Sequence, residues 1–194
     1  FITVVKATAT QNGLYADFSP KPLENESGNG LHINMSVKCA DGTDRTPAFM
    51  AGILAHIRDL TAFLNPSEAS YSRFGKCKAP KFVTWSHENR SQLIRIPAAK
   101  GEYRRIELRS PDPSANPYLA YALLIWAGLD GIAKDMCPAP AVNLNLLAAP
   151  ESETREFDTL PGSLKEAVAL ANGSALVRRV LGEDAASFLT DVRR

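Results

Sequence analysis

The residues of this sequence whose spacing most suggests chemistry are four of the five arginines between positions 90 and 109: Arg90, Arg95, Arg105 and Arg109. They fall in segments that are typical of β-strands, where charged residues are normally few. A planar guanidinium group can hold a carboxylate or a phosphate through two parallel hydrogen bonds. Two interpretations are possible at this point: a binding site for anions, or an exposed sheet face with surface ion pairs.

Glu107 favours the binding site. It alternates with Arg105 and Arg109, so the three side chains share one face of a strand. A carboxylate among arginines stays ionised and can bind a hard cation. A phosphate group together with Mg²⁺ is the ligand set that this arrangement suits.

A second polar group surrounds His32. It follows the pair Gly28-x-Gly30 and alternates with apolar residues, as do Asn34 and Ser36. Glycines allow the backbone to approach a ligand closely, although one such pair is weak evidence. A single strand histidine is more often hydrogen-bonded or exposed than bound to a metal, and both interpretations stay open on this evidence.

The elements that position these groups can be predicted from the apolar pattern. Strict alternation predicts a strand over 31–38, with a polar face that carries His32. Helical spacing predicts a helix over 47–64. Further strands are predicted over 14–18, 82–85, 91–96 and 103–109.

The second half is predicted to be mainly helical. Asn116 and Pro117 are suited to the N-cap and first position of a helix over 118–136. This helix is apolar on nearly every side, so we expect it to be buried. Segment 67–80 is predicted to be a loop, and two short amphipathic helices are predicted over 163–170 and 183–192.

The composition excludes several classes of protein. With 194 residues, of which 45% are hydrophobic and 22% charged, the chain fits one globular domain or a large part of a bigger one. The net charge of +1 disfavours binding to nucleic acid or to an anionic membrane. Three cysteines without a C-x-x-C pair argue against a disulfide framework and a thiolate zinc site. We expect a cytoplasmic protein, and the opening residues suggest a fragment.

Three stretches carry long motifs: Gly28-Asn-Gly-Leu-His-Ile-Asn-Met-Ser36, Asn89-Arg-Ser-Gln-Leu-Ile-Arg-Ile-Pro97 and Arg105-Ile-Glu-Leu-Arg-Ser-Pro-Asp-Pro-Ser-Ala-Asn-Pro-Tyr-Leu119. In order and spacing they resemble the catalytic-domain signatures of bacterial-type glutamine synthetases. The resemblance implies an α+β fold in which helices back a curved, largely antiparallel sheet. It also implies that residues 1–194 form the C-terminal part of that catalytic domain.

The resemblance implies a role for each matching residue. His32 and Glu107 match ligands of the metal that contacts the γ-phosphate of ATP, and the metal would be Mg²⁺ or Mn²⁺. Residues that match ATP contacts are Asn34, Ser36, Arg90 and Arg105. Residues that match contacts to the substrate glutamate are Gly28, Arg73 and Arg109. Arg90 and Arg95 match catalytic arginines that face the phosphoryl group.

Lys78 departs from the family pattern. The family has a flap loop whose glutamate, just before Ala-Pro, closes the site and helps to deprotonate ammonium, whereas here Lys78 precedes Ala79 and Pro80. A lysine with an ordinary pKa of about 10.4 is cationic, so it cannot accept a proton and it repels ammonium. Either the acceptor is a different amine, or the loop is shifted in register and Lys78 has no special role.

Other family features are missing from this stretch of sequence. The remaining metal carboxylates, in a Glu-x-Glu strand, and a small N-terminal β domain lie upstream of the matched region. Asn145 stands where some bacterial members carry a tyrosine that is adenylylated, so we do not expect that regulation.

The resemblance implies a ligase of nitrogen metabolism. ATP would phosphorylate the γ-carboxylate of glutamate, and ammonia or another amine would displace phosphate to form an amide. The intact protein would be a homo-oligomer without nucleic-acid or membrane partners, and the 194 residues alone would have little activity. Two alternatives remain: a γ-glutamyl ligase for a larger amine, and a non-catalytic relative that binds nucleotide or serves assembly.

Overall fold

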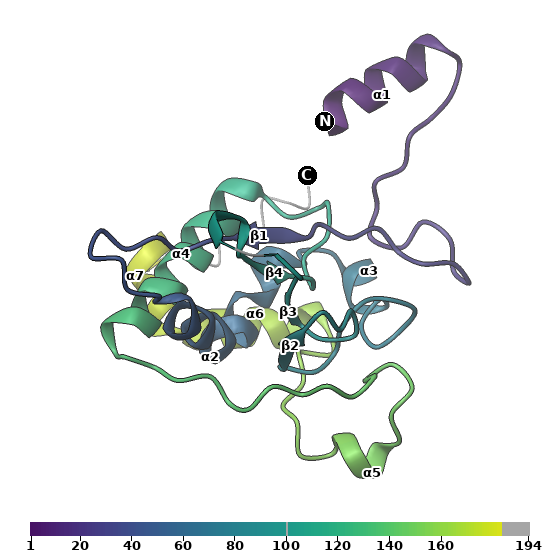
Figure 1. The fold of residues 1–194 in the computed structure, drawn as a ribbon. Coiled ribbons are helices and arrows are strands. Elements are labelled where there is room, and N and C mark those ends of the chain that lie inside the picture. Colours follow the sequence, from purple (N-terminus) through teal and green to yellow (C-terminus); the bar gives the residue numbers. More distant parts are fainter. Residues whose placement is uncertain (100, 184–194) are drawn as a thin grey trace.

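A four-stranded sheet is the part of the fold that carries the predicted polar residues. The computed structural model describes residues 1–99 and 101–183, and Figure 1 shows the helices that accompany the sheet. The strands are β1 (Ile33–Met35), β2 (Trp85–His87), β3 (Ile94–Ile96) and β4 (Ile106–Leu108), in the order β1-β4-β3-β2. β4 is antiparallel to both neighbours, and β2 is parallel to β3. The predicted α+β class with a mainly antiparallel sheet is confirmed.

The strands are shorter than predicted, but the predicted alternation along residues 31–38 is confirmed. Ile33 is buried and Leu31, Met35 and Val37 pack against the core, whereas Asn34 is exposed. One face of β1 therefore joins the core and the other carries polar groups.

Two long helices, α2 (Thr46–Leu64) and α4 (Pro117–Ala133), form the core with the sheet. Asn116 caps α4 as predicted, because its side chain accepts hydrogen bonds from the amides of Tyr118 and Leu119. Pro117 follows at the first helical position, where its missing N–H costs no hydrogen bond.

The two helices touch backbone to backbone. A Cβ atom on Gly52 would lie 2.2 Å from the carbonyl oxygen of Ala127, and one on Gly131 would lie 2.2 Å from that of Ala48. A Cβ on Gly128 would overlap the ring of Phe49. Only glycine permits so close a crossing at these positions.

The expectation that α4 is buried on all sides is wrong for the described chain. The face toward α2 is buried, but Tyr118 is 83% and Ile125 51% exposed. Trp126 is covered only in part, with the Arg179 guanidinium 4.7 Å from its ring centroid. An apolar helix needs neighbours on both sides to be buried, and within residues 1–99 and 101–183 only one side of α4 has them.

The remaining elements are short: α1 (Ile2–Gln11), α3 (Glu68–Tyr71), η1 (Gly101–Tyr103), α5 (Glu151–Thr154), α6 (Leu164–Gly173) and α7 (Ala175–Leu181). α6 confirms the helix predicted over 163–170, and α3 lies in the segment predicted as a loop. α1 buries none of its residues and extends away from the sheet and the other helices (Figure 1). None of the described helices is long and apolar enough to cross a membrane.

Two predicted elements need comment. The strand predicted over 14–18 is wrong, because these residues have irregular backbone and pair with no strand. Apolar residues can alternate without forming a strand when no partner edge is near. The helix predicted over 183–192 falls, except for Glu183, outside the described residues.

Candidate functional site

Strand register places Glu107 at the centre of the site. Glu107 is opposite Asn34 on β1 and opposite Arg95 on β3. Residues that oppose each other across antiparallel strands point to the same face of the sheet. The three short strands therefore bring an amide, a carboxylate and a guanidinium together from distant parts of the sequence.

The carboxylate of Glu107 is buried between two arginines. Its Oε2 accepts a hydrogen bond from Nη2 of Arg95 at 2.6 Å, and its Oε1 accepts one from Nη1 of Arg109 at 2.5 Å. Burial raises the pKa of this carboxyl, but the hydrogen bonds and charges of the two arginines outweigh burial and lower the pKa below its ordinary value. Glu107 is therefore ionised at neutral pH.

His32 faces the same carboxylate. Its Nδ1 lies 3.5 Å from Oε1 of Glu107. Burial and the charge of Arg109 lower the pKa of the imidazole, and the opposing effect of Glu107 is smaller. The ring is therefore neutral at neutral pH, which is the form that binds metal ions.

Two candidate protein ligands for a metal, His32 and Glu107, meet among the described residues. In the part of the chain that the structure describes, no three His, Cys, Asp or Glu residues gather closely enough to hold a metal ion. His32 and Glu107 supply one neutral nitrogen and one ionised carboxylate, which suit a divalent cation. They fit a metal site only as part of its ligand set, and the other ligands would have to come from outside the described residues.

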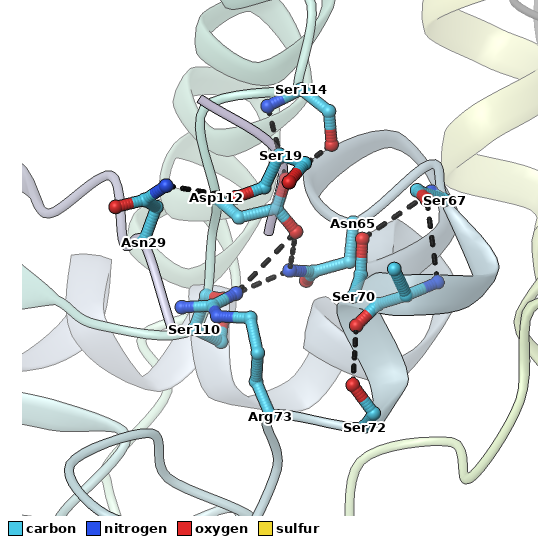
Figure 2. A network of polar contacts seen from close by, with 11 residues as sticks. Ser19, Asn29, Asn65, Ser67, Ser70, Ser72, Arg73, Ser110, Asp112 and Ser114 are labelled. Atoms are coloured by element: carbon cyan, nitrogen blue, oxygen red, sulfur yellow. Dashed lines mark hydrogen bonds and ion pairs between the residues drawn. The ribbon is translucent and has the colours of Figure 1, made fainter. Parts of the chain in front are cut away.

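Arg73 is fixed by a buried polar network. Its Nη1 donates to the carbonyl of Ser110 at 3.2 Å and to Oδ2 of Asp112 at 3.4 Å. The side-chain amide of Asn65 donates to the same two oxygens, each at 2.9 Å, and Ser114 donates its amide to the other oxygen of Asp112. Figure 2 shows Arg73 and Asn65 converging on Asp112. This network fixes one end of a guanidinium that is only 4% exposed.

The predicted glycine pair packs against Arg73. A Cβ on Gly28 would lie 2.4 Å from the carbonyl oxygen of Pro20 and 2.9 Å from Cγ of Arg73. A Cβ on Gly30 would lie 3.3 Å from Nη2 of Arg73 and 3.7 Å from Nε2 of His32. The absence of side chains at these positions lets the loop approach both groups closely.

These groups open into one hollow of about 470 Å³, which we call the cationic cleft. The predicted site residues that line it are Gly28, His32, Arg73, Lys78, Arg90, Arg95, Glu107 and Arg109. The structure thus brings together residues that the sequence spreads over positions 28 to 109. Lys78 lies at the cleft with Lys76, Cys77 and Ala79 from the same loop.

The other predicted ATP contacts lie outside the cleft. Asn34 lines a second hollow of about 270 Å³ beside α4, and its Oδ1 accepts a hydrogen bond from Nε of Arg105 at 3.0 Å. His32 lines this hollow as well as the cleft, so the two are adjacent. Ser36 lines a third hollow, just beyond β1.

Sequence reasoning missed several residues of the site. Lys21 and Lys76 line the cleft from loops. Loops have no periodic pattern, so nothing in the sequence indicated that these lysines belong to the site. Asp112 and Asn65 do not line it but hold Arg73. The motif Ser110-Pro-Asp-Pro-Ser114 could have indicated that Asp112 is held in a rigid turn, although not which residue it contacts.

Comparison with known proteins identifies the family. The family model described as "Glutamine synthetase, catalytic domain" matches residues 1–194. The chain is 44% identical to the glutamine synthetase of Methanosarcina mazei, covering 94% of this chain and 44% of the relative. It is 42% identical to that of Pyrococcus abyssi, covering 100% of this chain and 47% of the relative. The chain thus spans about half the length of these curated relatives, both of which are archaeal.

Solved structures agree with this likeness. A structure described as a GmaS/ADP complex superposes with a TM-score of 0.86 at 33% identity, covering 99% of this chain and 48% of the other. A second, described as GmaS without ligand, also gives a TM-score of 0.86, at 34% identity, covering 100% of this chain and 47% of the other. From the match along its whole length, we conclude that the chain belongs to the glutamine synthetase catalytic-domain family.

Proposed function

We propose that residues 1–194 are the C-terminal part of the catalytic domain of an ATP-dependent ligase that forms an amide at the γ-carboxylate of glutamate. The observation that carries the proposal is the buried, ionised Glu107 between Arg95 and Arg109, beside a neutral His32. Phosphoryl transfer requires fixed positive charge and precise positioning more than covalent participation by the protein. The cationic cleft offers both.

Glutamate binds through Arg73 and Arg109 with the backbone of Gly28. Both side chains line the cleft, and their hydrogen bonds to described residues are made through Nη1 alone. The Nη2 group of each arginine is therefore left for a substrate carboxylate, which accepts charge-assisted hydrogen bonds. The close packing of Gly28 on Arg73 keeps the loop in place for a backbone contact.

ATP lies across the cleft and the second hollow. Arg90 is exposed at the cleft and binds phosphate oxygens there, while Asn34, Ser36 and Arg105 lie along β1 and β4 for the rest of the nucleotide. Arg95 faces the phosphoryl group from the strand next to Glu107. His32 and Glu107 would hold Mg²⁺ or Mn²⁺, which would supply positive charge to neutralise the phosphates.

The reaction has two steps. An oxygen of the glutamate γ-carboxylate attacks the γ-phosphorus of ATP and ADP leaves, giving γ-glutamyl phosphate. The free amine then attacks the carbonyl carbon of the γ-glutamyl group, the bond from that carbon to the phosphate oxygen breaks, and the nitrogen loses a proton. Arg90 and Arg95 stabilise negative charge on the transferred group in both steps.

The whole enzyme is proposed to be of the bacterial type and a homo-oligomer. Its upstream part supplies the further carboxylates that complete the metal site of His32 and Glu107. A second candidate, a γ-glutamyl ligase for an amine other than ammonia, is favoured by the position of Lys78 at the cleft.

The test is phosphate release by the full-length protein with ATP, Mg²⁺, glutamate and a panel of amines, with the γ-glutamyl amide identified by mass spectrometry. Arg73→Ala is expected to raise the KM for glutamate at least about tenfold, the effect of losing one charged hydrogen-bonded contact, and to leave the KM for ATP unchanged. Arg155→Ala, at an exposed position after α5, is the control. ATP binding without phosphate release for any amine would contradict the proposal and indicate a non-catalytic relative.

A further inference from the structure

The cations of the cleft divide into two groups. Arg95 and Arg109 pair with Glu107, and Arg73 pairs with Asp112. The other cations that line the cleft are Lys21, Lys76, Lys78 and Arg90. Among the side chains that the structure describes, those of residues 1–99, 101 and 103–183, no carboxylate lies within 4.0 Å of this second group. The cleft therefore has positive charge that no described carboxylate neutralises.

A closed turn holds two of these lysines at the cleft. The amide of Gly75 donates to the carbonyl of Ala79 at 3.0 Å, and the amide of Ala79 donates to the carbonyl of Lys76 at 3.1 Å. Gly75 and Cys77 both have positive φ, at 73° and 54°. In this turn Lys76, Cys77 and Lys78 all line the cleft, instead of alternating toward and away from it.

The inference rests on the proposed function. There, Arg73 and Arg109 bind the glutamate carboxylate, and Arg90 with Arg105 binds the phosphates of ATP. Lys76 and Lys78 are assigned to neither substrate, although both are exposed and free of acidic partners in the described chain. They are available for an anionic group on the third substrate.

We propose that Lys76 and Lys78 bind a carboxylate of the acceptor, so that the acceptor is an amine carrying a carboxylate, such as an amino acid. Ammonium, alkylammonium and polyamine cations carry only positive charge near neutral pH, so these lysines repel them. A carboxylate is attracted to the lysines and brings its amino group into the cleft.

The same charges favour the reactive form of the acceptor. Nearby positive charge disfavours a protonated amine, so the amino group binds as the neutral nucleophile. Its nitrogen forms a bond to the carbonyl carbon of γ-glutamyl phosphate, the carbon–oxygen bond to phosphate breaks, and phosphate leaves with that electron pair. The nitrogen then releases one proton to solvent, which balances the step without an acidic residue in the loop.

The experiment measures kcat/KM for each amine, from phosphate release by the full-length enzyme with ATP and glutamate at saturation. Glycine and β-alanine are compared with ammonium, methylamine and 1,4-diaminobutane. The wild-type enzyme is expected to prefer glycine or β-alanine to every amine without a carboxylate. Lys76→Glu and Lys78→Glu are each expected to lower the ratio of kcat/KM for glycine to that for methylamine at least about tenfold, or about 1.4 kcal/mol.

Two controls separate this role from general effects of charge. Lys165→Glu makes the same charge change at an exposed position on α6, away from the cleft, and is expected to leave the ratio unchanged. Lys78→Arg keeps the positive charge and is expected to retain the preference for glycine.

Three outcomes would overturn the inference. The first is a wild-type preference for ammonium or methylamine. The second is that the lysine variants have a higher KM for ATP or glutamate, by the same factor with every amine. The lysines would then bind ATP or glutamate instead of the acceptor. The third, no phosphate release with any amine, would contradict the proposed function as well, whereas the first two contradict this inference alone.

Discussion

Glu107 uses each of its carboxylate oxygens to bind a different arginine: Arg95 on β3 and Arg109 directly after β4. That Glu107 and Arg109 share a face was predictable from their spacing of two. That Arg95 joins them was not, because it depends on the register of β3 against β4. Asn65 and Asp112 were missed for the same kind of reason, since their contact with Arg73 links three separate parts of the chain.

The first residue-level prediction concerns charge. Glu107→Gln removes the negative charge between two poorly exposed guanidinium groups, and breaking such a pair typically costs about 3–5 kcal/mol. The free energy of unfolding of the 194-residue chain, measured by urea denaturation at pH 7, is expected to fall by about this amount. Glu153→Gln, on the exposed face of α5, is the control and is expected to change it by less than about 0.5 kcal/mol.

The second concerns pH. The pKa of Glu107 is lower in the folded chain than its ordinary 4.5, so the folded state binds its proton less readily than the unfolded state. Its contribution to stability is therefore complete above about pH 4.5 and is lost as the pH falls through the lowered folded value. Urea denaturation at pH 7 and pH 3.5 should show a smaller loss of stability in Glu107→Gln than in the wild type. An equal loss in both would show that Glu107 does not contribute.

At the level of elements, α2 and α4 determine the shape of the core. Their approach depends on Gly52 and Gly131, whose neighbours leave no room for a Cβ. α2 was predicted almost to the residue because its apolar spacing agrees with its burial. The exposed side of α4 was not predictable, because an all-apolar helix does not reveal which neighbours are present.

The prediction at this level is that Gly52→Ala and Gly131→Ala each destabilise the chain by at least about 1–3 kcal/mol, the usual cost of overpacking, even though alanine favours helix. Gly173→Ala is the matched control, since a Cβ there meets no atom within 4 Å. It is expected to leave stability unchanged or to raise it by up to about 1 kcal/mol. Thermal denaturation of the three variants tests both expectations, and equal melting temperatures would contradict the proposed crossing.

At the level of the whole molecule, two helices of the described chain leave apolar side chains exposed. α1 buries none of its residues, and Tyr118, Ile125 and Leu129 are exposed along α4. Under the proposed function the metal site is incomplete, because among the described residues only one carboxylate, that of Glu107, meets His32 there.

We therefore predict that the isolated 194 residues release no phosphate above background from ATP with glutamate and any amine, whereas the full-length protein does. The comparison is made at equal molar concentration of catalytic segment, with circular dichroism to establish that the isolated chain is folded. Turnover by the isolated chain would contradict the need for further ligands.

The Arg73 network has a consequence for how this sequence can vary. Asn65 directly follows α2, and Asp112 lies in the turn that leads into α4, so the pair that holds Arg73 depends on how the two helices dock. A larger residue at the Gly52–Gly131 crossing would move these helix ends and with them the guanidinium. Under the proposed function, we therefore expect sequence change in the core to be limited by affinity for glutamate as well as by folding, so that a screen for glutamate binding selects glycine at both positions.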